Sequence, residues 1–66
     1  MDKKAFGKMW KNWLYDIDKS ESDIAKEVGL SQQALNTKMR NATIKYIELS
    51  DIVERHGYTI DIRKKE

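Results

Sequence analysis

The side chains best suited to recognition chemistry lie between Val28 and Ile47, a stretch that contains no acidic residue. Three cations and four amides lie within it: Lys38, Arg40, Lys45, Gln32, Gln33, Asn36 and Asn41. An amide donates and accepts hydrogen bonds at once, whereas lysine and arginine only donate. This combination indicates recognition by hydrogen bonds and positive charge rather than covalent chemistry.

The preceding stretch carries the opposite charge. From Asn12 to Val28 the acidic residues outnumber Lys19 and Lys26, and they are Asp16, Asp18, Glu21, Asp23 and Glu27. The net charge of the whole chain is only +2, so the distribution of charge is more informative than its sum. On charge alone, the alternative is a randomly mixed, solvated surface.

The sequence offers little for catalysis or metal binding. It has no cysteine, and its only histidine, His56, falls on the core-facing period of its segment, where we expect it to pack or to cap. Asp16-Ile17-Asp18 resembles a fragment of a metal loop, but no further ligand or loop glycine follows it. No nucleophile–base pair and no glycine-rich phosphate loop is present. We therefore expect no enzyme, no metal, no cofactor and no small-molecule substrate.

An amphipathic helix is predicted over residues 3–16. Its apolar side chains recur at i, i+3, i+4, i+7, i+8 and i+11, and they are Phe6, Met9, Trp10, Trp13, Leu14 and Ile17. Both tryptophans lie on this main apolar face. We therefore interpret them as core residues rather than as a surface that stacks a ligand.

Two short helices joined by a tight turn are predicted next, at the spacing of a helix-turn-helix. Ser20 and Asp23 form a capping box for the first helix, and Gly29 ends it in a left-handed conformation. Ser31 caps the second helix, over 32–40. Small and apolar residues close the wedge between the two helices: Ile24, Ala25, Val28, Leu30 and Leu35, with Met39 also facing inward.

A fourth helix is expected to start at a Thr43 cap and to end at Gly57, with an inward stripe of Tyr46, Leu49, Ile52, Val53 and His56. Beyond it the apolar period changes to two, which predicts a short β-strand carrying Tyr58, Ile60 and Ile62. The predicted fold class is therefore all-α. It comprises a small four-helix helix-turn-helix domain over 1–57, then a short C-terminal β-strand and basic tail over 58–66.

The predicted strand has no partner elsewhere in the sequence, and a lone strand is unstable. Pairing with the same strand of a second subunit would satisfy its backbone and bury Tyr58, Ile60 and Ile62, so we expect a homodimer. The alternatives are a strand that packs on its own domain and a frayed tail. No segment predicts a membrane span or a secretory leader, so we expect a cytoplasmic protein without a membrane partner.

The segment Asp23-Ile24-Ala25-Lys26-Glu27-Val28-Gly29-Leu30-Ser31-Gln32-Gln33-Ala34-Leu35-Asn36 resembles the helix-turn-helix of the Cro/Xre family of phage and bacterial repressors. The resemblance covers about residues 20–62 and extends through the fourth helix to His56-Gly57-Tyr58. It implies a transcriptional regulator that binds double-stranded DNA. It also implies that helix 32–40 lies in the major groove, where its first residues meet base edges.

The resemblance also implies roles for individual residues. The expected base-reading side chains are Gln32, Gln33, Asn36 and Thr37. Their amides match the donor and acceptor of adenine and the Thr37 methyl suits thymine, so we predict A·T pairs in the half-site. The expected phosphate contacts are Ser20, Ser22, Ser31, Lys38, Arg40, Asn41 and Lys45, and the basic N-terminal face and tail extend this footprint. In a dimer, half-sites would lie about 34 Å apart. The alternative for the exposed amide face is ordinary solubility.

Glu21 departs from the family pattern. Family members often carry glutamine at this position, where an amide reaches phosphate but a carboxylate is repelled. An acidic residue there instead favours the positive end of the helix dipole. Together with the acidic residues around it, Glu21 favours a rival hypothesis: a helix-turn-helix scaffold that binds protein, such as an antitoxin-like or inhibitor module.

Overall fold

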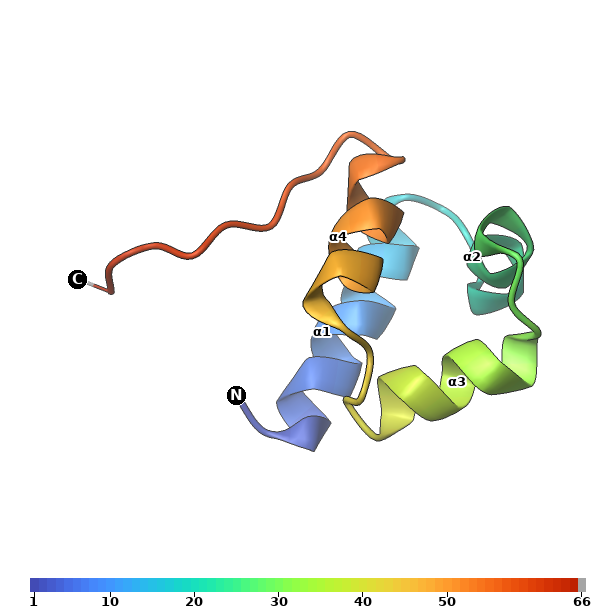
Figure 1. Cartoon of the computed structure of the whole chain (residues 1–66), viewed down its shortest axis with the longest axis horizontal. Helices are drawn as coiled ribbons and strands as arrows, with labels where there is room; N and C mark the ends of the chain where they lie inside the picture. The colour runs from blue at the N-terminus through green and yellow to red at the C-terminus, as the bar shows by residue number, and fades with distance from the viewer. Residues whose placement is uncertain (66) are drawn as a thin grey trace.

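Local hydrogen bonds define where each helix of this protein begins, and the computed structural model describes them for residues 1–65. The four helices are α1 (Lys3–Asp16), α2 (Glu21–Val28), α3 (Gln32–Arg40) and α4 (Tyr46–Glu54). Figure 1 shows α3 running crosswise to α1 and α4. The bounds expected for the first and third helices are confirmed.

The caps of α1, α2 and α3 come from side chains directly before each helix. Asp2 accepts from the Ala5 N–H at 2.8 Å at the start of α1. Ser20 Oγ accepts from the Asp23 N–H at 3.1 Å, and Asp23 Oδ2 accepts from the Ser20 N–H at 3.0 Å, so the predicted capping box is present. Ser31 Oγ accepts from the amide of α3's third residue at 3.1 Å. Each cap satisfies backbone donors that the helix itself leaves unpaired.

The helices also end alike: each is followed by a left-handed residue. At the end of α2, Gly29 has φ 74°, and the Leu30 N–H returns to the Ala25 carbonyl at 2.9 Å. At the end of α4, Gly57 has φ 81°. These are Schellman closures, and glycine adopts their positive φ without steric cost. The sequence predicted both glycine positions.

The core receives side chains from all four helices. It consists of Trp10, Leu14, Ile24, Ala25, Leu35, Met39 and Ile52. Ile24 and Leu35 are 0% exposed, so α2 and α3 press their apolar faces fully against the interior. The Trp10 and Trp13 rings stack with centroids 5.5 Å apart. The prediction that the tryptophans pack with the core is confirmed.

The start of α4 differs from the prediction. The helix begins at Tyr46, and Thr43 is not its cap; the Thr43 N–H instead donates to the Lys38 carbonyl at 2.9 Å and closes the end of α3. The donor at the start of α4 is satisfied from inside the helix, because Glu48 Oε1 accepts from the Lys45 N–H at 3.2 Å. A carboxylate at the third helical position therefore replaces the expected threonine.

The prediction of a C-terminal β-strand is wrong for residues 58–65. Residues 58–65 form no strand, and Figure 1 shows them running away from the helices; Glu66, the last residue of the predicted tail, lies outside the described residues. The physical reason is the absence of a neighbouring strand edge within residues 1–65. The segment is anchored by a Tyr46 hydroxyl that donates to the Ile60 carbonyl at 2.9 Å.

Ile62 at the outer end of this segment is 88% exposed and Tyr58 is 44% exposed. Ile62 is therefore largely uncovered, whereas the Tyr58 ring is partly covered by an edge contact with Trp13, with 5.7 Å between the ring centroids. Across residues 1–65, none of the helices has the length and apolar character required to cross a membrane.

Candidate nucleic-acid interface

One face of α3 is polar and exposed, and the other is buried. Leu35 is 0% exposed and Met39 is 2% exposed, so this side of the helix belongs to the core. The opposite side carries the four expected base-reading residues, and all of them are exposed: Gln32, Gln33, Asn36 and Thr37. The amides therefore lie on the surface and not in the interior, as the periodicity of α3 predicts.

Thr37 differs from the three amides because its hydroxyl is already engaged. Its Oγ1–H donates to the Gln33 carbonyl at 2.9 Å, one helical turn earlier. The side chain can still accept a hydrogen bond and present its methyl group, but its donor is used. Thr37 can therefore contact a ligand through its methyl group or by accepting a hydrogen bond, but not by donating one.

The expected phosphate contacts divide into capping and surface residues. Ser20 and Ser31 are exposed, but their oxygens accept the capping bonds of α2 and α3, and Ser22 is half-buried. The remaining candidates with exposed side chains are Arg40, Asn41 and Lys45. The serines hold two helix N-termini in position, and backbone N–H groups at such ends favour anions.

Lys38 is the one expected phosphate contact whose charge is used within the protein. Its ammonium lies 3.1 Å from Glu48 Oε2, and both side chains are about one-third exposed, 34% and 37%. The Lys38 ammonium, followed by the Lys45 backbone N–H, lowers the pKa of the Glu48 carboxyl. The pair ties α3 to α4, so Lys38 has a structural partner that sequence spacing did not reveal.

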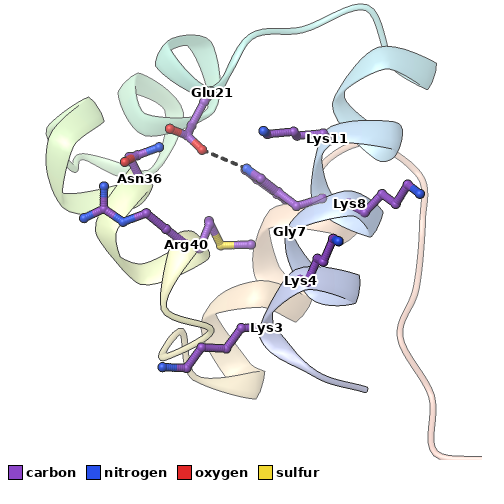
Figure 2. A pocket seen from close by; sticks show the side chains of 10 residues that line it. Lys3, Lys4, Gly7, Lys8, Lys11, Glu21, Asn36 and Arg40 are labelled. Atoms are coloured by element: carbon purple, nitrogen blue, oxygen red, sulfur yellow. Dashed lines mark hydrogen bonds between the residues drawn. The ribbon is translucent and has the colours of Figure 1, made fainter.

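A groove of about 580 Å³ lies between α1 and α3. Figure 2 shows lysines of α1 along one side and Asn36 and Arg40 of α3 along the other. Its charged lining residues are Lys3, Lys4, Lys8, Lys11, Glu21 and Arg40. The basic character of the N-terminal face was expected from the sequence, but its position beside the exposed face of α3 was not. The spacing of Lys4, Lys8 and Lys11, which puts them on one side of a helix, was the available signal.

Glu21 stands at one wall of this groove and has a partner in α1. Its Oε2 accepts from the Trp10 indole N–H at 2.9 Å, drawn as a dashed line in Figure 2. A buried indole needs an acceptor, and a side chain with an oxygen at position 21 supplies it. The equivalent nitrogen of Trp13 is buried with no hydrogen-bond partner among residues 1–65. The carboxylate therefore has a structural role in addition to its place at the α2 N-terminus.

His56 lies away from this groove, between α1, α2 and α4. Its Nε2 is 2.9 Å from Glu27 Oε1, and its ring meets the edge of Trp13 at 5.6 Å. This is a packed histidine that joins elements, as its position in the sequence predicted. Within residues 1–65, no three histidine, cysteine or acidic side chains converge at a distance suited to a metal ion.

Comparison of the chain with models of protein families, with curated proteins and with solved structures gave no match.

Proposed function

We propose that this protein is a sequence-specific, double-stranded-DNA-binding regulator of the Cro/Xre helix-turn-helix type. The observation that carries the proposal is the division of α3. Its core side is fully buried at Leu35, while the amides of Gln32, Gln33 and Asn36 lie exposed on a helix that contains no acidic residue. A helix of this kind fits the major groove, which admits one helix and offers paired donors and acceptors.

In this proposal α2, the turn at Gly29 and α3 form the helix-turn-helix, and α3 lies in the major groove. Gln32, Gln33 and Asn36 read base edges with their amides, and A·T pairs suit them because adenine presents a donor beside an acceptor. Phosphates are contacted by Arg40, Asn41 and Lys45. The backbone N–H groups at the N-termini of α2 and α3 that the Ser20 and Ser31 caps do not satisfy add further contacts. Such contacts fix the helix in position, and the amides supply the specificity.

The C-terminal segment supports a homodimer as the binding form. Its residues 58–62 belong to no strand within residues 1–65, and Ile62 is almost fully exposed. Pairing with the same segment of a second copy would cover this surface and present two copies of α3 to half-sites about 34 Å apart. Sedimentation should then give a dimer, whereas a monomer at high micromolar concentration would remove this element of the proposal.

Substitution of Gln33 tests base reading. DNA sequences selected by the protein from a random pool provide the specific site, and fluorescence anisotropy measures binding to that site and to random duplex. Gln33→Ala should lose about 1–3 kcal/mol on the specific site and little on random duplex, because a base contact carries specificity and a phosphate contact does not. A matched Lys26→Ala variant on α2 should keep the affinity of the unmodified chain for the specific site. Equal losses on both duplexes would reject Gln33 as a base-reading residue.

The second candidate is a helix-turn-helix scaffold that binds another protein. It is favoured by the carboxylate of Glu21 beside α3 and by exposed apolar side chains on α4 and the C-terminal segment, where Ile47 is 80% exposed. The two candidates differ in their response to salt. A DNA-binding protein binds random duplex at low salt, and log K falls by about 0.9 per phosphate contact for each unit of log salt. Negligible binding at low salt would favour the protein-binding scaffold.

A further inference from the structure

The groove between α1 and α3 gathers positive charge that the fold does not neutralise. Four lysines of α1 and Arg40 of α3 line it, with Glu21 as its only lining carboxylate. Among residues 1–65, no carboxylate lies within ion-pair distance of any of these five cations. Unpaired like charges around a concave surface repel one another, and they concentrate anions near it.

The lysines are arranged along the axis of α1. Lys4, Lys8 and Lys11 follow one another at i, i+4 and i+7, so they form a row about 10 Å long. DNA carries one phosphate per about 3.4 Å of axis on each strand. A row of this length therefore faces more than one phosphate.

The groove continues directly into the surface proposed to read bases. Asn36 and Arg40 line the groove and also belong to the exposed face of α3 (Figure 2). Gly7 leaves the groove without a side chain in the second turn of α1, and a Cβ built there would meet nothing within 4 Å. The interior packing of the protein therefore does not require glycine at this position, and its absent side chain leaves the helix backbone open to an approaching ligand.

Glu21 is the one group in the groove that opposes an anion. Its Oε2 accepts the Trp10 indole N–H, so one of its two oxygens is already engaged within the protein. Five cations against one engaged carboxylate leave the groove positive.

We propose that this groove binds the phosphate backbone of duplex DNA beside the bases that α3 reads, with Lys4, Lys8 and Lys11 as the main contacts. The inference rests on the proposed DNA-binding function and adds a second contact surface, outside the helix-turn-helix. It identifies α1 as a DNA-contacting helix rather than only a support for the core.

The test measures binding of a random duplex of about 20 base pairs to the full chain at several salt concentrations between about 50 and 200 mM. Lys4→Gln/Lys8→Gln removes two charges from the groove, and Lys19→Gln/Lys26→Gln removes two charges elsewhere. All four positions are exposed, and glutamine is as good a helix former as lysine, so folding should persist. The circular dichroism spectrum of each variant checks that the helices are retained.

The groove variant should reduce the salt slope by about 1.8, which corresponds to roughly 60-fold weaker binding near 0.1 M salt. The control pair should change the slope by less than about 0.5. Lys4→Arg/Lys8→Arg keeps both charges and should keep the slope of the unmodified chain.

Two outcomes would overturn the inference, and they are distinguishable. If the unmodified chain binds DNA but the groove pair and the control pair change the slope equally, α1 is not a contact surface and the proposed function stands. If the unmodified chain does not bind duplex DNA at low salt, the proposed function and this inference fail together.

Discussion

The α1–α3 side of this protein and the α2–α4 side use their charges in opposite ways. On the α2–α4 side, His56 lies against Glu27 and Arg55 against Asp51, at 2.9 and 3.1 Å. Arg55 also donates to the Glu27 carbonyl at 3.5 Å. On the α1–α3 side, the five cations of the groove have no such partner within residues 1–65.

The difference separates charges that hold the fold from charges that are left for a partner. A pair between elements stabilises the monomer, although exposed pairs contribute only about 0–1 kcal/mol. Unpaired cations contribute mutual repulsion instead, so their gathering in one groove adds nothing to stability. The contrast predicts that substitutions among the paired charges change stability, whereas substitutions among the groove charges change binding.

Of the single substitutions that test this division, Glu21→Gln should give the largest response, because it removes the only carboxylate of the groove. The amide oxygen can still accept the Trp10 indole N–H, so the wall of the groove is kept. We expect random duplex to bind up to about eightfold more tightly near 0.1 M salt, the effect of about one added phosphate contact. Anisotropy measures it. Asp16→Asn removes the same charge outside the groove and should change binding less than about twofold; an equal gain would mean that net charge alone is responsible.

Glu27→Ala should affect stability and leave binding unchanged. It removes the partner of His56 on the α2–α4 side, and we expect a loss of about 0.5–1 kcal/mol in the free energy of unfolding. Urea unfolding at pH 6 to 7 measures it, and Lys26→Ala on the next residue is the matched control, expected within about 0.5 kcal/mol of the unmodified chain. A changed salt slope for DNA binding would contradict the division between the two sides.

The pH dependence of stability should give the smallest response, at the Lys38–Glu48 pair. The Lys38 ammonium lowers the pKa of Glu48 below its ordinary value of 4.5, so the folded state favours the ionised carboxylate. This stabilisation is present above pH 4.5 and is lost as the pH falls through the folded-state pKa. Urea unfolding between about pH 6 and pH 3 should show a shallower acid loss for Glu48→Gln than for the unmodified chain. Identical profiles would show that the pair contributes nothing measurable.

Agreement between sequence and structure is best where the interactions are local. The Ser20 and Ser31 side chains accept hydrogen bonds from backbone N–H groups only three residues further along the chain. Gly29 and Gly57 supply the positive φ that the turns after α2 and α4 require. Periodicity alone correctly divided α3 into a buried side and an exposed side. The Thr43 cap was wrong because Glu48, a residue inside the helix, satisfies the same donor.

The predicted strand at 58–62 shows a different limit. Alternation of Tyr58, Ile60 and Ile62 describes a segment able to form a strand, but a strand exists only when another backbone pairs with it. Within residues 1–65 no such edge is present, and the segment instead meets α4 through the bond from the Tyr46 hydroxyl to the Ile60 carbonyl.

Met9 and Tyr46 were expected on the apolar faces, but they are 40% and 51% exposed. By itself the sequence determined the four helices, the residues that close most of their ends and the rest of the apolar faces that form the core. These depend on neighbours within about one helical turn, and the order of residues sets those neighbours. Only the tertiary structure decided which charges meet. Glu21 reaches Trp10 across the groove, Lys38 reaches Glu48, and the lysines of α1 come to lie beside Asn36 and Arg40, because packing of the helices brings together groups that are distant in the chain.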